Sequence, residues 1–263
     1  MLFIGIDLAW SENNKTGIAI LEGDKNTIRL ISVSLVLKDP EIMESIDKIT
    51  KKEYALISID APLIVPNEGG RRLAEALVGN LFRKYNAGAH PANRKRLSSW
   101  TGKIRGEEIS KLLEEKGFIH SPEIKRYENT RKFFEVYPHP SMVVLFNLST
   151  VIPYKAKPKR NYNSRYKAFR QYQDYLKNLK ISNLSKIISQ DVTKLKAQKL
   201  KDYEDQLDAI FCAYLSYYTW LHPERCKVLG DMKEGYILTP VFDFMKSSQS
   251  LLENFSSLHA PKQ

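Results

Sequence analysis

The sequence predicts an α/β protein organised around a mixed β-sheet, and the first sixty residues carry the evidence. Apolar segments at 2–7, 17–21 and 27–37 have the length and composition of strands and are joined by short polar turns, as in an antiparallel meander. Residues 39–52 then place apolar side chains at helical spacing, and a fourth apolar segment follows at 54–60. Parallel strands require a crossover of this kind, so we expect the first and fourth strands to be parallel neighbours.

The remainder of the chain predicts helices around this sheet. The segment 61–130 is more polar, with helical patterns at 69–85 and 106–118, and we interpret it as an insertion after the fourth strand. A strand containing Glu135 follows it. The later part is predicted to be helical over about 164–179, in part of 190–202 and over 203–221, with an extended segment at 235–240. We expect one domain over residues 1–246, with a basic segment at 151–201 and a polar tail at 247–263.

Composition favours a cytoplasmic protein that does not enter a membrane. No apolar run in the 263 residues approaches the ~20 needed to cross a bilayer, and the N-terminus lacks the basic and small-residue features of a signal peptide. The two cysteines, Cys212 and Cys226, indicate neither a disulfide framework nor a zinc site. The oligomeric state is left open by these observations.

The net charge of +11 is concentrated in one segment. Residues 151–201 contain fourteen Lys or Arg and two acids, with tyrosines interleaved in "PYKAKPKRNYNSRYKAFRQYQDY". Cations that neutralise phosphates beside rings that stack on bases are typical of sites for unpaired DNA or RNA. The alternative is a solvated linker and helix face. The predicted nucleic-acid contacts are Lys155, Lys157, Lys159, Arg160, Arg165, Lys167 and Arg170.

Five acidic residues stand where carboxylates are unusual. Asp7 and Asp60 end apolar strands, Glu135 interrupts another, and Asp205 and Asp208 share one face of a helix. If the strand ends and the helix converge, these acids need protons or cations to neutralise them. Oxygen ligands without a His or Cys cluster select Mg²⁺ or Mn²⁺, and two such ions can activate a water and stabilise the leaving oxygen of a phosphodiester.

Each acid also has a structural alternative. Asp7 and Asp60 can cap turns, Glu135 can pair with Arg131 or with a lysine of the insertion, and Asp205 can interact favourably with the dipole of its helix. Arg71 and Arg72 can clamp a phosphate, His139 can assist proton transfer, and Trp10 and Trp100 can stack on bases. Residues of these types are more often surface charges, hydrogen-bonded histidines or packed aromatic rings.

The motifs "GIDLAW", "SIDAPL", "FEVYPHP" and "EDQLDAIFCAY" resemble those of the RNase H-like superfamily and, more closely, the family called domain of unknown function 429, regarded as predicted nucleases of that fold. The resemblance extends from residue 2 to about residue 220. It implies a mixed five-stranded sheet in the order 3-2-1-4-5, flanked by helices. It also implies a divalent-metal centre at Asp7, Asp60 and one or both of Asp205 and Asp208, with Glu135 as the family's acidic strand residue.

The leading hypothesis is therefore a metal-dependent nuclease that hydrolyses DNA or RNA by a two-metal mechanism. A protein that binds nucleic acid without catalysis is the main alternative, and the absence of Mg²⁺- or Mn²⁺-stimulated cleavage would distinguish it. A phosphoryl transferase of the sugar-kinase and actin branch is disfavoured, because Ala9 stands where that branch places a glycine and the chain is short for a duplicated domain.

Overall fold

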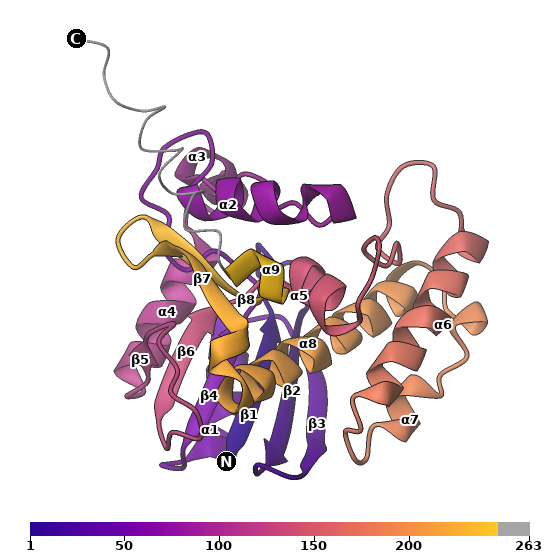
Figure 1. Cartoon of the computed structure of the whole chain (residues 1–263), viewed down its shortest axis with the longest axis horizontal. Helices are drawn as coiled ribbons and strands as arrows, with labels where there is room; N and C mark the ends of the chain where they lie inside the picture. Colours follow the sequence, from indigo (N-terminus) through magenta and orange to yellow (C-terminus); the bar gives the residue numbers. More distant parts are fainter. Residues whose placement is uncertain (247–263) are drawn as a thin grey trace.

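The computed structural model describes residues 1–246, apart from the side chain of Trp100, and has a six-stranded mixed sheet at its centre (Figure 1). Its strands are β1 (Leu2–Asp7), β2 (Thr16–Gly23), β3 (Ile28–Val36), β4 (Ala55–Ile59), β5 (Ile119–His120) and β6 (Arg131–Glu135). They lie in the order β3-β2-β1-β4-β6-β5. The first three strands pair antiparallel, while β1–β4, β4–β6 and β6–β5 are parallel. The tail predicted at 247–263 lies outside the described residues.

The number of strands differs from the prediction. The antiparallel meander and the parallel pairing of the first and fourth strands are confirmed. The sheet has six strands and not five, because the two-residue β5 pairs with the outer edge of β6. A strand of that length is too short for alternation of apolar and polar residues to reveal it. The predicted extended segment is β8 (Gly235–Pro240), which pairs with the unpredicted β7 (Cys226–Asp231) in a separate antiparallel hairpin.

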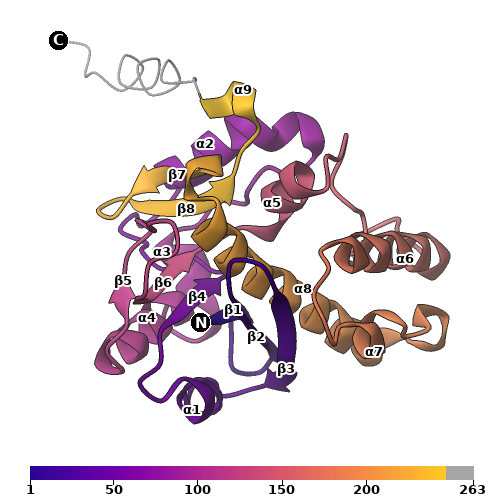
Figure 2. The same cartoon turned by 60° about the horizontal axis from the view of Figure 1, so that its bottom comes forward.

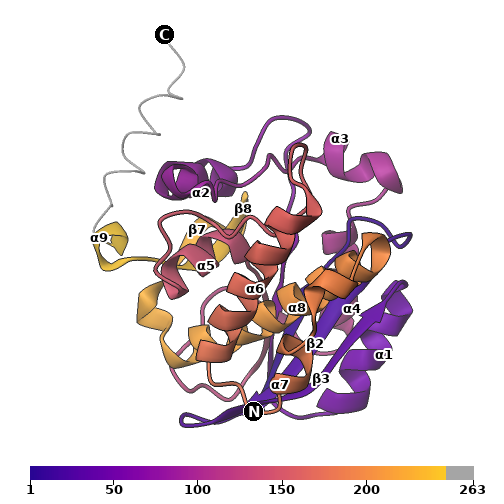
Figure 3. The ribbon, with the colours of Figure 1, turned by 90° about the vertical axis from the view of Figure 1, so that its right-hand side faces the viewer.

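Helices cover both faces of the main sheet. Helices α1 (Asp39–Thr50) and α4 (Arg105–Glu115) pack on one face. The longest helix, α8 (Ala197–Leu221), packs on the other face, and its buried cluster also includes residues of α2 (Leu73–Phe82), α5 (Pro138–Leu145) and α6 (Tyr162–Asn178). Figure 2 shows α1 and α8 on opposite sides of the strands, and Figure 3 shows α6 beside α8. The shorter helices are α3 (Arg94–Leu97), α7 (Ser185–Ile188) and α9 (Asp243–Lys246), with 3-10 turns at Arg83–Tyr85, Ser98–Trp100, Val192–Lys194 and Pro223–Arg225.

Two glycines let α8 lie directly on the strands. A Cβ atom at Gly5 of β1 would meet the backbone nitrogen of Ala213 at 2.0 Å, and one at Gly17 of β2 would meet the carbonyl oxygen of Asp205 at 2.3 Å. Only glycine permits such an approach. Gly17 is also the register partner of Asp7. The N-terminal part of α8 is therefore fixed beside the end of β1.

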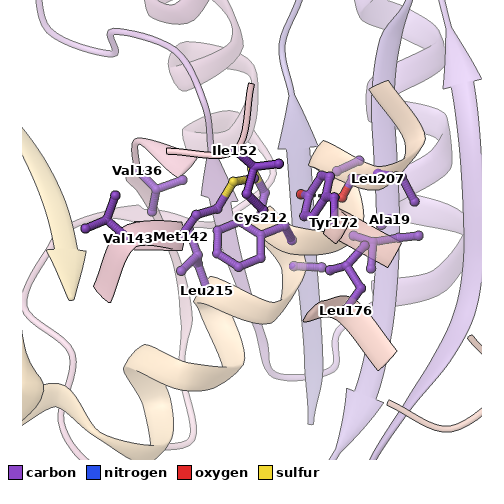
Figure 4. Close-up of a cluster of buried hydrophobic side chains, with 14 of the residues drawn as sticks. Ala19, Val136, Met142, Val143, Ile152, Tyr172, Leu176, Leu207, Cys212 and Leu215 are labelled. Carbon is purple, nitrogen blue, oxygen red and sulfur yellow. Dashed lines mark hydrogen bonds between the residues drawn. The ribbon is translucent and has the colours of Figure 1, made fainter. Parts of the chain in front are cut away.

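A buried apolar cluster joins the basic segment to this face of the sheet. Met142 of α5, Tyr172 and Leu176 of α6, and Leu207 and Cys212 of α8 are each fully buried within it (Figure 4). Burial of aromatic and aliphatic side chains of this size supplies most of the stabilisation that holds helices together. The cluster places the beginning of α6, and the loop before it, next to the acidic face of α8.

Candidate active site

The ends of two neighbouring strands bring Asp7 and Asp60 side by side. β1 and β4 are parallel with Ile6 opposite Ile59, and the backbone N–H of Asp60 donates to the carbonyl of Ile6 at 2.9 Å. Side chains alternate between the faces of a strand. Ile6 and Ile59 belong to the core under α1 and α4, so the next residue on each strand points to the face that carries α8.

Helix α8 adds two more aspartates to this place. Asp205 lies where α8 contacts Gly17, and it lines the same cavity as Asp7. Asp208 follows three residues later and is completely buried. The convergence predicted for Asp7, Asp60, Asp205 and Asp208 is therefore what the packing of α8 produces.

Two lysines supply positive charge to this group. The Nζ atom of Lys155 lies 2.9 Å from Oδ2 of Asp208, whose Oδ1 accepts hydrogen bonds from Tyr154 at 2.7 Å and Tyr172 at 3.3 Å. Lys201 donates to Asp205 at 2.5 Å. Because Asp208 is enclosed by these partners, its carboxylate lies behind the open part of the site.

Glu204 sits beside the aspartates and is neutralised separately. It is 3% exposed and pairs with Lys201 at 3.0 Å and with Arg165 at 3.3 Å. Two cationic partners for one buried carboxylate offset the free-energy cost of burying it. Glu204 is thus a structural member of the cluster.

Asp7 and Asp60, called here the front aspartates, have pKa values that reflect the crowding of carboxylates in the site. Burial raises the pKa of Asp7 well above its usual range; Lys155 opposes this shift, while Asp208, Asp60 and Asp205 add to it. Burial likewise raises the pKa of Asp60 to about 7, against the opposing charge of Lys155. Neither Asp7 nor Asp60 has a Lys or Arg nitrogen within 4.0 Å in residues 1–246. These two carboxylates therefore favour a proton or a bound cation.

A cavity of about 620 Å³ opens in front of these residues. Asp7, Asp60 and Asp205 line it, whereas Asp208 does not. Its volume falls in the range typical of sites for small organic molecules or single nucleotides. The other charged and aromatic lining residues are Trp10, Lys15, His90, Tyr137, His139, Lys155, Lys157 and Lys201.

Glu135, which the sequence predicted as a catalytic acid, does not line this cavity; it lines a neighbouring cavity together with Asp60, and its charge adds to the raised pKa of Asp60. It lies opposite Ile59 in the register of β4 and β6, so its side chain leaves the sheet on the face away from α8. There Glu135 is 2% exposed, pairs with Arg72 at 2.5 Å and accepts a hydrogen bond from the backbone of Leu63 at 2.9 Å. Arg72 also pairs with Glu75. These contacts tie the insertion to the sheet through Arg72, in place of the partners considered from the sequence.

The motif "YPHP" contributes a neutral imidazole to the cavity. The Nδ1 atom of His139 lies 3.1 Å from the hydroxyl oxygen of Tyr137. Burial lowers the pKa of His139 to about 3, helped by the nearby charge of Lys155. His139 is therefore uncharged near neutral pH, and one of its two ring nitrogens can accept a hydrogen bond.

The predicted nucleic-acid contacts fall into three groups. Lys155 and Lys157 line the cavity. Arg160 and Arg165 are used inside the protein: Arg160 donates to the carbonyl of Lys155 at 2.9 Å, and Arg165 donates to that of Tyr154 at 2.9 Å. The exposed members are Lys159, Lys167 and Arg170.

The aromatic residues of the basic segment do not form the stacking surface that was predicted. Tyr154, Tyr166 and Tyr172 are buried, because the inner face of α6 must cover α8. Tyr162 is 41% exposed and remains accessible. Trp10 is a better placed ring, since it is 40% exposed at the cavity and the Arg96 guanidinium lies 5.2 Å from its centroid.

A residue of the insertion fixes the loop that presents Trp10. Arg105 of α4 is 6% exposed and donates to the carbonyls of Ala9 at 2.9 Å and Ser11 at 3.2 Å. It also pairs with Asp39 at 2.7 Å. Neither Arg105 nor the ammonium of Lys155 was expected in these roles. The only sequence signal for Lys155 is that a buried aspartate group requires nearby cations.

The fit to a divalent cation rests on the chemistry of the donors. Across the described residues, no three His, Cys, Asp or Glu side chains are grouped so as to hold a metal ion. Magnesium, however, is commonly held by one or two carboxylates, with waters and substrate phosphates completing its shell. Asp7 and Asp60 meet that lower requirement, and Asp205 lines the same cavity.

Comparison with known sequences places the chain in a family. None of the helices within residues 1–246 is long and apolar enough to cross a bilayer. A search of curated proteins finds no match to this sequence. A family model described as "Protein of unknown function (DUF429)" matches residues 5–234, which include all four aspartates and both lysines of the site. The chain therefore belongs to the DUF429 family.

Proposed function

We propose that this protein is a nuclease that hydrolyses phosphodiester bonds of DNA or RNA with the help of Mg²⁺ or Mn²⁺. One observation carries the proposal. Asp7 and Asp60 end adjacent parallel strands, face a cavity of about 620 Å³ and lack an ion-pair partner within residues 1–246, while their pKa values are raised. Paired carboxylates of this kind at a concave site are typical of metal-dependent chemistry.

In this proposal Asp7 and Asp60 hold the metal ion, with Asp205 beside them. When bound, the ion would supply a more acidic water and neutralise charge on the phosphate oxygens. The imidazole of His139 stays neutral in the same cavity and can accept a hydrogen bond there. Lys201 limits the charge of Asp205 through its ion pair.

Other residues of the cavity would hold the nucleic acid. Lys157 is exposed at the cavity and suits a phosphate group. Trp10 offers a ring on which a base can stack. The exposed cations Lys159, Lys167 and Arg170 extend the positive surface along the loop and α6. A single strand that enters the cavity would meet both kinds of contact.

We also propose that the fold is RNase H-like. The arrangement β3-β2-β1-β4-β6, with antiparallel pairing in the first three strands, supports this assignment. The placement of carboxylates at the ends of β1 and β4 and on α8 supports it further. Fold alone does not establish activity, so the functional proposal rests on the site.

A second candidate is a nucleic-acid-binding protein without catalysis. It is favoured by the ion pairs of Lys155 with Asp208 and Lys201 with Asp205, which already neutralise part of the acidic group. Such a protein would bind nucleic acid with strong salt dependence and leave it intact.

The test is a cleavage assay on single-stranded, duplex and branched DNA and on RNA, with Mn²⁺, Mg²⁺ or EDTA. We expect cleavage with a metal ion, none in EDTA, and none by Asp7→Asn with any metal. Asp47→Asn is the matched control, because Asp47 is exposed on α1 and its partner Lys116 lies away from the cavity. Binding without cleavage would support the second candidate, and cleavage that survives EDTA and Asp7→Asn would contradict the proposal.

A further inference from the structure

We infer that Lys155 is a built-in cation that takes the place of a second metal ion, so that the site binds one divalent cation. The inference deepens the proposed function and rests on it. It concerns the side of the site formed by Asp208, where the sequence predicted a metal ligand.

Lys155 is the cationic partner of the Asp208 oxygen that accepts no hydrogen bond within the described residues. The Lys155 Nζ lies 2.9 Å from one carboxylate oxygen, and the hydroxyls of Tyr154 and Tyr172 donate to the other. Asp208 is completely buried and does not line the cavity. An ammonium group paired with a carboxylate at this distance neutralises it as a metal ion would.

The backbone around Lys155 is held on both sides. Arg160 donates to the carbonyl of Lys155 at 2.9 Å, and Arg165 donates to that of Tyr154 at 2.9 Å. Tyr154 itself is completely buried. About a quarter of the Lys155 side chain is exposed, and that part faces the cavity. The backbone of Lys155 is thus held beside the aspartates of the site.

The charges of the site balance with a single divalent ion. Lys155 pairs with Asp208 and Lys201 with Asp205, which leaves Asp7 and Asp60 as the two aspartates without an ion-pair partner among residues 1–246. Glu204 and Glu135 have cationic partners of their own. One divalent cation at Asp7 and Asp60 would neutralise the remainder, whereas two would leave the buried site with an excess of positive charge, which is costly in a region shielded from water.

The proposed role also assigns Lys155 a place near the substrate. Its ammonium faces the cavity that Asp7 and Asp60 line, so it could donate to a phosphate group bound in that cavity. In two-metal enzymes the second ion stabilises the charge on the leaving oxygen. Lys155 would provide that stabilisation as a hydrogen-bond donor.

The test is isothermal titration calorimetry of the full chain with Mn²⁺ in the absence of nucleic acid. We expect about one Mn²⁺ per chain for the wild type and for Lys157→Met, which removes a neighbouring cavity lysine. Lys155→Met is expected to bind about two, because Asp208 then lacks its cation. Adding Asp208→Asn to Lys155→Met is expected to restore a single ion.

The outcomes separate the inference from the proposed function. Two ions in the wild type, or a single ion in Lys155→Met that melts as a folded protein, would overturn the inference while metal-dependent cleavage stands. No Mn²⁺ binding by the wild type would overturn the metal-dependent function and the inference with it. If Lys155→Met fails to fold, two ions in the wild type or in the double variant would still overturn the inference, since the double variant buries no unpaired charge at Asp208.

Discussion

Replacing Asp60 with Asn tests whether charge in the acidic site destabilises the metal-free protein. Burial raises the pKa of Asp60 from its ordinary 3.8 to about 7, with Lys155 opposing and Asp208 adding to the shift. Between these values the folded protein binds more protons than the unfolded chain, so the free energy of unfolding falls as the pH rises through this window. Ionised Asp60 then destabilises the fold by about 4 kcal/mol near pH 8 and about 2 kcal/mol near pH 5.

Urea unfolding in EDTA measures this effect directly. We expect Asp60→Asn to raise the free energy of unfolding by up to those amounts, with the larger gain near pH 8. We also expect Mn²⁺ to stabilise the wild type more than the variant, because bound metal relieves the same repulsion. Asp47→Asn is the control, since its carboxylate is exposed on the other face of the sheet. A variant less stable than the wild type near pH 8, or equally stabilised at both pH values, would refute the reasoning.

Four further predictions concern the fold and the binding surface. Arg72→Met leaves two buried glutamates without their cation, so urea unfolding should show a loss of about 3–5 kcal/mol, part of which Glu135→Gln recovers; an unchanged midpoint would contradict this. Gly5→Ala places a Cβ atom 2.0 Å from a backbone nitrogen of α8, and a melting curve like that of the wild type would argue against the close packing. In fluorescence anisotropy with single-stranded DNA, Trp10→Ala should weaken binding by about 1–3 kcal/mol. Lys157→Met should reduce the salt slope by about 0.7, and unaltered binding by both variants would exclude this cavity as the contact surface.

The first half of the sheet was predictable because its strands are long and their connections are local. The segments that form β1, β2, β3 and β4 are apolar runs separated by turn residues or a helix. The pattern that predicts each strand is contained within the strand itself and the few residues beside it. The short β5 and the hairpin strand β7 were missed. Both depend on partners that lie elsewhere in the chain.

The site was predictable where strand ends determine it. Asp7 and Asp60 lie close together because they end two neighbouring parallel strands. Asp205 joins them because α8 packs across these strands. Glu135 lies beside Asp60 but its carboxylate pairs with Arg72, because Phe134 and Val136 belong to the core on the α8 side and the residue between them faces the other way; its catalytic role stays a prediction. The alternation of side chains along the strand in "FFEVYP" already indicates that Glu135 and its two neighbours lie on opposite faces of the sheet.

The cations and aromatic rings could not be assigned from sequence. The basic segment has a uniform composition, yet its lysines and arginines divide into cavity, buried and exposed positions. Its tyrosines are mostly buried, because α6 covers α8. Lys155 reaches Asp208 across 53 residues of sequence, and only tertiary packing creates that pair.

The rate of metal-dependent cleavage by the wild type and by Asp7→Asn tests the central claim most directly. The measurement uses a labelled single-stranded oligonucleotide, with Mn²⁺ or EDTA and with Asp47→Asn beside them. We predict that Asp7→Asn lowers the Mn²⁺-dependent rate by at least about 100-fold, because changes to outer-shell partners of a metal ligand already reduce activity by 10–100-fold. Asp47→Asn should cleave like the wild type. Equal rates for the wild type and Asp7→Asn, or equal rates in Mn²⁺ and EDTA, would contradict the assignment of this site to metal-dependent hydrolysis.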